Sequence, residues 1–79
     1  MLKIRPDRNI GSNIQAARYA KKLTQDEVIA KLQLMGINIS RSTYAKIETN
    51  RMNIRASELI ALSEILGVDY NYFFHDLTV

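Results

Sequence analysis

Helix-breaking residues are scarce in this sequence, and their scarcity limits the fold more than any other feature. The chain of 79 residues has one proline, Pro6, and three glycines, Gly11, Gly36 and Gly67. Long segments without either residue type favour helices over strands, so the sequence predicts an all-α protein. A chain of this length forms one domain at most. Because it has no cysteine, core packing must stabilise it without disulfides.

The clearest helix signal lies in TQDEVIAKLQLM, residues 24–35. Thr24 followed three residues later by Glu27 is the capping-box pattern, in which each side chain caps a backbone group of the other. Gly36 can adopt the left-handed conformation that ends a helix. The segment therefore predicts a helix with defined ends.

A second helix is predicted over residues 40–49, SRSTYAKIET. Ser40 can cap it, and Asn50 tolerates the positive φ that follows a helix end. Tyr44 and Ile47 would face the core. The remaining, outward positions are Arg41, Ser42, Thr43, Ala45 and Lys46.

Helical periodicity predicts three further helices. One covers about residues 10–22, one begins near Ser57 and ends at Gly67, and a short one follows Asp69. The sequence therefore predicts a compact five-helix bundle. The apolar positions expected to face its core are Ile10, Ile14, Ala17, Val28, Ile29, Leu32, Met35, Tyr44, Ile47, Leu59, Ile60, Leu62, Ile65, Leu66, Tyr70, Phe73 and Phe74.

The charge of the chain favours an anionic partner. The net charge is +3 and the isoelectric point about 9.5, and all 11 lysines and arginines precede residue 56. We divide the chain into a basic N-terminal arm, residues 1–9, and a helical domain, residues 10–79. No apolar run is long enough for a signal peptide or a membrane span. We therefore expect a cytoplasmic protein with no membrane partner.

Groups that serve catalysis or metal binding are few. The chain has one histidine, His75, and no cysteine, and a lone histidine near a terminus is typical of a solvated or capping side chain. The sequence contains neither a glycine-rich phosphate loop nor paired histidines at metal-ligand spacing. It therefore predicts a protein that is not an enzyme and that needs no metal or cofactor.

The two helices at residues 24–35 and 40–49 form a pattern of their own. Two short helices joined by a few residues that include glycine can present the second helix to the DNA major groove. Arginine, lysine, serine and threonine on the outward face are side chains that contact base edges or phosphates. Alternatively, this face is a solvated helix surface with no ligand.

The chain resembles the lambda-repressor-like, Xre-type (Cro-like) helix-turn-helix family in three segments and their spacing, LTQDEVIAKL, ISRSTYAKIETN and LIALSEILGVDYNYFF. The resemblance covers about residues 10–75. It implies a five-helix domain that binds double-stranded DNA, regulates transcription as a bacterial or phage repressor, and acts as a homodimer. A second hypothesis is an antitoxin-like module that binds a protein partner, with DNA binding secondary.

The resemblance also implies roles for individual residues. Gln25 matches a residue that touches phosphate and buttresses the recognition helix, while Arg18 and Glu48 match a partly buried structural ion pair. Base-reading positions are matched by Arg41, Ser42 and Lys46, a groove-wall position by Thr43, and loop positions that contact the DNA backbone by Asn50, Arg51 and Asn53.

The sequence departs from the family pattern at three places. The interval from Ala30 to Gly36 is longer than usual, so we expect a longer second helix or a looser turn. Tyr44 stands at a usually aliphatic position, and a buried ring would require its hydroxyl to reach the surface or a hydrogen-bonding partner. Asn50 replaces the usual glycine, and no proline follows Arg51.

Overall fold

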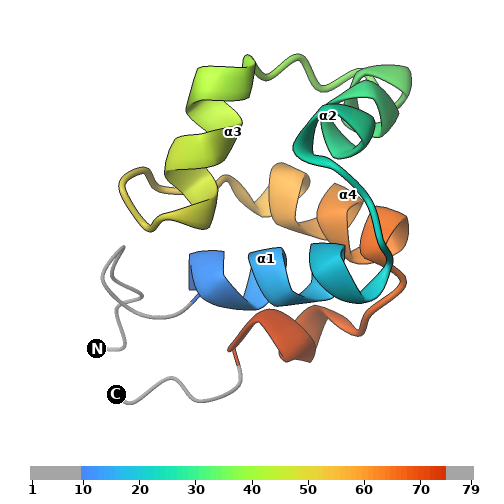
Figure 1. Ribbon diagram of the computed structural model, residues 1–79, viewed down its shortest axis with the longest axis vertical. Helices are drawn as coiled ribbons and strands as arrows, with labels where there is room; N and C mark the ends of the chain where they lie inside the picture. Colours follow the sequence, from blue (N-terminus) through green and yellow to red (C-terminus); the bar gives the residue numbers. More distant parts are fainter. Residues whose placement is uncertain (1–9, 75–79) are drawn as a thin grey trace.

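The computed structural model describes residues 10–74, which form helices and loops without a strand. In chain order the helices are α1 (Ile10–Ala20), α2 (Gln25–Leu34), α3 (Arg41–Glu48), α4 (Ala56–Leu66) and the 3-10 helix η1 (Tyr70–Phe74) (Figure 1). The prediction of a compact all-α protein is confirmed for this part of the chain. The predicted arm, residues 1–9, and His75 lie outside the described residues.

Local hydrogen bonds explain where α2 begins and ends. Thr24 Oγ1 accepts from the Glu27 backbone N at 3.1 Å, and Glu27 Oε1 accepts from the Thr24 backbone N at 2.8 Å. The bond from the Thr24 backbone is the larger cause that lowers the pKa of Glu27. After Leu34, Gly36 has a left-handed φ of +84°. The predicted capping box and glycine stop are both confirmed.

The ends of α3 also follow the prediction. Ser40 Oγ accepts from the Thr43 backbone N at 3.1 Å, which satisfies a donor that the first turn leaves without a partner. Asn50 has a φ of 60° and lies just beyond the helix. Tyr44 and Ile47 are buried, so the inward face of α3 is the one that the sequence predicts.

Two predicted helices differ from the structure. α1 ends at Ala20, earlier than expected, because Lys22 adopts a left-handed conformation with a φ of 58°. The fifth helical segment, η1, is a 3-10 helix: Asp69 accepts from the Asn71 backbone at Oδ1, and its carbonyl accepts from the Tyr72 backbone. The described residues therefore contain four α-helices and one 3-10 helix. α4 agrees with the prediction and is followed by Gly67, whose φ is +66°.

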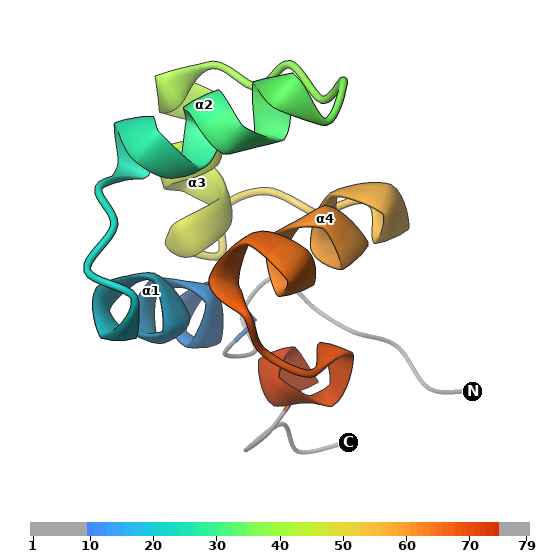
Figure 2. The ribbon, with the colours of Figure 1, turned by 90° about the vertical axis from the view of Figure 1, so that its right-hand side faces the viewer.

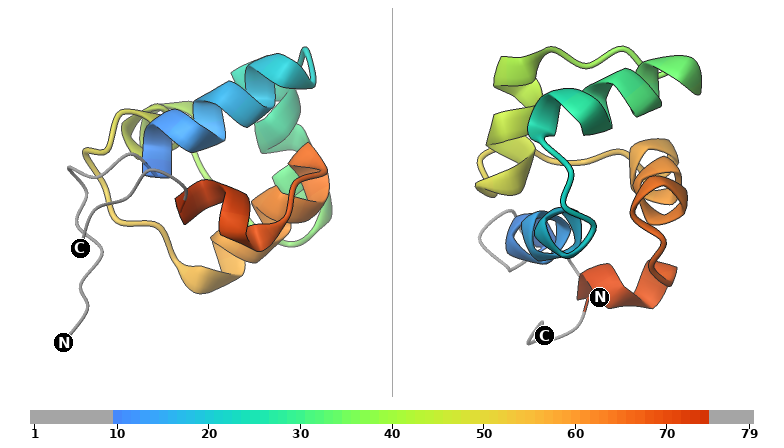
Figure 3. Two further views of the ribbon diagram at one scale, coloured as in Figure 1. Left: turned by 90° about the horizontal axis from the view of Figure 1, so that it is seen from below. Right: turned by 45° about the vertical axis from the view of Figure 1, so that its right-hand side comes forward.

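The core lies around α1, which contacts α3, α4 and η1. α2 and η1 lie on opposite sides of the bundle (Figure 2), and a view nearly along α1 shows α2 and α3 on one side of it and η1 on the other (Figure 3, right). The buried apolar side chains are Ile10, Ile14, Ala17, Val28, Leu32, Tyr44, Ile47, Leu59, Ala61, Leu62, Leu66 and Phe73.

Three apolar side chains that were predicted to face the core are exposed. Ile60 is 51% exposed, Met35 44% and Tyr70 40%. Ile60 follows the buried Leu59, but one residue turns a helix by about 100°, so its side chain leaves the face that packs on the bundle. Met35 follows the last residue of α2, and Tyr70 opens η1, so both side chains lie at helix ends on the surface.

Candidate nucleic-acid interface

α2 and α3 form a helix pair whose first turns lie close together. Residues 35–40 connect them, and Ile37 and Ile39 in this connection pack against the core. The first residue of α3, Arg41, contacts Gln25 and Asp26 in the first turn of α2. The pair therefore presents two helix N-termini on one side of the bundle, where helix dipoles favour anions.

The outward face of α3 carries the polar side chains that the sequence singled out. Arg41, Ser42 and Lys46 are exposed, and Thr43 is half-buried. Ser40 Oγ lies 3.0 Å from Thr43 Oγ1, so the two hydroxyls share a hydrogen bond. Because Tyr44 and Ile47 hold the opposite face in the core, this polar face is open to a ligand.

Five side chains form a continuous polar chain from the interior to this face. Arg18 donates from Nε to Glu48 Oε2 at 2.7 Å and from Nη2 to Glu48 Oε1 at 3.0 Å. Gln25 Nε2 donates to Glu48 Oε1 at 3.1 Å, and its Oε1 accepts from Arg41 Nε at 3.4 Å. Arg41 Nη1 lies 3.2 Å from Asp26 Oδ2. We refer to these residues as the polar chain.

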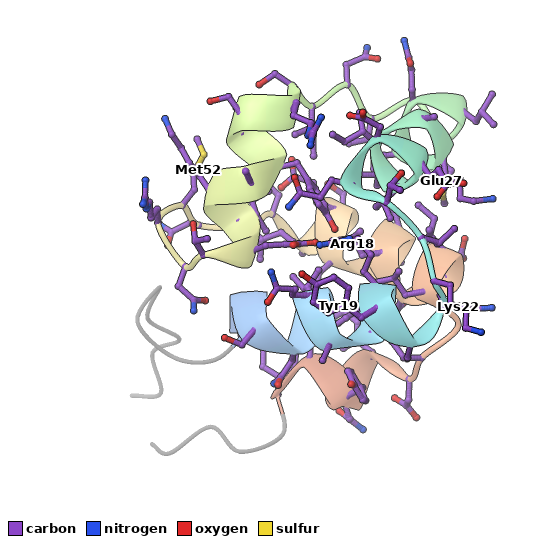
Figure 4. The ribbon with its side chains drawn as sticks, in the orientation of Figure 1. Arg18, Tyr19, Lys22, Glu27 and Met52 are labelled. Atoms are coloured by element: carbon purple, nitrogen blue, oxygen red, sulfur yellow. The ribbon has the colours of Figure 1, made fainter. Side chains whose placement is uncertain are left out.

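The buried end of the polar chain joins α1 to α3. Arg18 reaches from α1 toward α3 (Figure 4), where its side chain is 7% exposed and that of Glu48 is fully buried. Arg18 Nη1 also donates to the Leu23 carbonyl at 3.0 Å, and its guanidinium lies 4.6 Å from the centre of the Tyr19 ring. The ion pair predicted between Arg18 and Glu48 is therefore present.

The electrostatics of this pair follow from its burial. Desolvation raises the pKa of Glu48, but the hydrogen bond from Arg18, the nearby Tyr44 hydroxyl, the hydrogen bond from Gln25 and the Arg18 charge together lower it by more, so the net pKa lies below the ordinary value. The hydrogen bond to Glu48 raises the pKa of Arg18. Both groups therefore stay charged at neutral pH.

The geometry of the helix pair agrees with a comparison against known protein families. A family model described as a helix-turn-helix domain matches residues 11–76, most of the chain. The chain belongs to this helix-turn-helix family. Helix-turn-helix domains place their second helix in the DNA major groove, so the membership indicates a DNA-binding regulator. Searches of curated proteins and of solved structures found no match.

In the helix-turn-helix domain, the predicted DNA-contacting residues of the loop after α3 differ in their exposure and contacts. Arg51 and Asn53 are exposed, in the same loop as Met52, which is labelled in Figure 4. Asn50 is half-buried, and its Oδ1 accepts from the Gly11 backbone N at 2.8 Å. Arg51 and Asn53 thus lie free for a ligand, whereas Asn50 also ties the loop to α1.

Sequence reasoning missed the role of Gly11 in the helix-turn-helix domain. A Cβ atom at this position would meet the Ile47 carbonyl oxygen, and would lie 2.7 Å from the Glu48 carbonyl oxygen and 2.8 Å from Asn50 Oδ1. Only glycine lets the start of α1 approach the end of α3 this closely. The signal was a glycine inside a predicted helix, where it is unfavourable without a packing reason.

Tyr44 in the helix-turn-helix domain contradicts one expectation. Its side chain is completely buried, yet its hydroxyl reaches neither the surface nor a hydrogen-bond partner among residues 10–74. Desolvation, followed by the close approach of the Glu48 carboxylate, raises the pKa of Tyr44 well above its usual value. The hydroxyl therefore stays protonated beside the ion pair.

Two other features are absent from residues 10–74. No three His, Cys, Asp or Glu side chains gather there at a spacing that could hold a metal ion. No helix in this part of the chain is both long enough and apolar enough to cross a bilayer.

Proposed function

We propose that this protein is a sequence-specific transcriptional repressor of the lambda-repressor-like, Xre type, which acts by binding rather than catalysis and reads the major groove with α3. The observation that carries the proposal is the outward face of α3, where Arg41, Ser42 and Lys46 are exposed beside the first turn of α2. A homodimer on a two-fold-related operator completes the proposal, because such symmetry places two recognition helices one helical turn of DNA apart.

The side chains divide by the part of DNA that suits them. Arg41 can donate two hydrogen bonds to guanine, and Ser42 and Lys46 can contact base edges on the same face. The other predicted DNA-binding residues suit contacts to phosphate oxygens, which hold the duplex in place without reading its sequence. These residues are Gln25, Thr43, Asn50, Arg51 and Asn53.

The test is a selection of binding sites from random duplex DNA, followed by affinity measurements at several salt concentrations. Arg41→Ala should change which bases are preferred. Arg51→Ala should weaken binding to all sequences alike and reduce the slope of log affinity against log salt by about 0.9, the change for one lost phosphate contact. Equal losses on all sequences for both variants would contradict this division, and no enrichment with the unchanged protein would reject the proposed function.

A second candidate function, an antitoxin-like module that binds a protein, has one observation in its favour. An apolar cleft lies between the loop after α3, the start of α4 and η1, with Ile54, Leu59 and Phe74 among its walls. Met52 and Tyr70 also line it and are 44% and 40% exposed. This function would be favoured if a toxin co-purifies with the protein, and if Met52→Asp abolishes the co-purification whereas Arg41→Ala preserves it.

A further inference from the structure

We propose that Asp26 positions the guanidinium of Arg41 and thereby sets how strongly the protein discriminates between base pairs at the site that Arg41 reads. The proposal rests on the proposed DNA-binding function and adds a residue that the resemblance does not assign. It makes the carboxylate on α2 a specificity-determining group, although a carboxylate beside DNA would by itself weaken binding.

Two contacts hold the Arg41 side chain against the first turn of α2. Its Nε donates to Gln25 Oε1 at 3.4 Å, and its Nη1 lies 3.2 Å from Asp26 Oδ2. Gln25 is in turn oriented by the buried Glu48, which accepts from Gln25 Nε2 at 3.1 Å. The direction of the Arg41 guanidinium is thus fixed from the interior through Gln25 and from the surface through Asp26.

The two contacts leave the donors that base reading needs. A guanidinium has five N–H groups, of which the contacts to Gln25 and Asp26 use two. The free set includes both N–H groups of Nη2 and one of Nη1, which is enough for two hydrogen bonds to guanine. Asp26 and a guanine can therefore bind Arg41 at the same time.

The Arg41–Asp26 ion pair is too exposed to contribute much to the stability of the fold. The side chains of Arg41 and Asp26 are 65% and 71% exposed, and exposed ion pairs contribute little to folding. An arginine that is already held in one direction loses less conformational freedom when it binds a base. The Asp26 charge repels phosphates at every DNA site alike, so the gain in discrimination comes from the fixed direction of the Arg41 guanidinium.

The experiment compares Asp26→Asn with a matched control, Glu64→Gln, which removes the same charge from an exposed position on α4. Binding is measured to the selected operator, to operators altered at the base pair for which Arg41→Ala loses preference, and to random duplex DNA. Thermal unfolding of each variant checks that it folds, which we expect because Asp26 is exposed.

We expect Asp26→Asn to lower discrimination at the Arg41 base pair by about two- to fivefold, the range for one exposed ion pair, while affinity for random duplex rises. Glu64→Gln should leave discrimination unchanged, and Asp26→Glu should retain most of it. Combining Asp26→Asn with Arg41→Ala should cost no more discrimination at that base pair than Arg41→Ala alone.

Two outcomes would overturn the inference. If Asp26→Asn raises affinity for every sequence equally, Asp26 acts only through its charge. If it increases discrimination at the Arg41 base pair, Asp26 competes with DNA for Arg41 instead of positioning it. The absence of any sequence preference in the unchanged protein would instead reject the proposed function itself, so the two failures are distinguishable.

Discussion

Arg18 Nε lies 2.7 Å from Glu48 Oε2, and this contact joins the C-terminal part of α1 to the last residue of α3 inside the bundle. An ion pair at this depth fixes the helix that carries the candidate recognition face to the helix at the centre of the core.

Breaking the pair on one side should destabilise the fold strongly. Arg18→Met leaves the Glu48 carboxylate buried without its charged partner, and we expect the free energy of unfolding to fall by about 3–5 kcal/mol. Urea denaturation monitored by circular dichroism measures this loss. The double variant Arg18→Met with Glu48→Leu should be more stable than Arg18→Met, because it no longer buries an unpaired charge. A double variant that is less stable than the single one would contradict this explanation.

Stability should fall in acid. The pKa values of Glu48 and Glu27 are lowered in the folded state, so below the ordinary glutamate pKa of about 4.3 the unfolded chain binds more protons. Folding stability is therefore fully present above that pH and is lost as pH falls through the lower, folded-state values. Denaturation curves measured at about pH 2.5 to 7, a range that spans the ordinary and the lowered glutamate pKa values, give the slope of the unfolding free energy against pH. Glu27→Gln should reduce the slope, and an unchanged slope would show that its pKa is not lowered.

Removing the Tyr44 hydroxyl should not harm the protein. Because this buried hydroxyl has no hydrogen-bond partner in residues 10–74, Tyr44→Phe removes a desolvated polar atom and keeps the ring. We expect the free energy of unfolding to stay the same or to rise by about 1 kcal/mol. Tyr44→Ala, which leaves a cavity, should lower it by about 3–5 kcal/mol. A clear loss in Tyr44→Phe would show that the hydroxyl is hydrogen-bonded in solution.

Gly11→Ala should reverse the usual effect of alanine in a helix. Alanine normally stabilises a helix by about 0.5–1 kcal/mol over glycine, but here its Cβ would meet the carbonyl oxygens of Ile47 and Glu48. We expect a net loss of about 1–3 kcal/mol, the range for overpacking. Ser12→Ala, at the exposed neighbouring position, is the matched control and should have little effect. Equal thermal stability of both variants would mean that α1 and α3 separate easily at this contact.

The ends of α2 and α3 and the stop after α4 could be predicted from sequence because their causes are local. Thr24 and Glu27 cap each other three residues apart, and Ser40 caps the next helix in the same way. The chain adopts positive φ values at Gly36 and Gly67, a conformation that glycine permits without strain. Signals of this kind act within one helical turn, so neighbouring helices do not change them.

The contacts between distant segments could not be predicted in the same way. Gly11 and Asn50 are far apart in the chain, and nothing in either segment indicates that they meet. The exposure of Ile60 depends on which side of α4 the other helices cover, which an apolar sequence does not specify. The resemblance located the face of α3, but the contact between Arg41 and Asp26 requires both helices in place.

Because of the polar chain, residues on the outward face of α3 differ in how freely they can be substituted. Ser42 and Lys46 can be substituted singly, whereas Arg41 cannot. Ser42 and Lys46 are exposed, and no described side chain contacts theirs through a hydrogen bond or ion pair. A designer who wishes to change the proposed base preference can vary these two positions independently. A change at Arg41 also alters the surroundings of Gln25, and therefore calls for joint selection with α2.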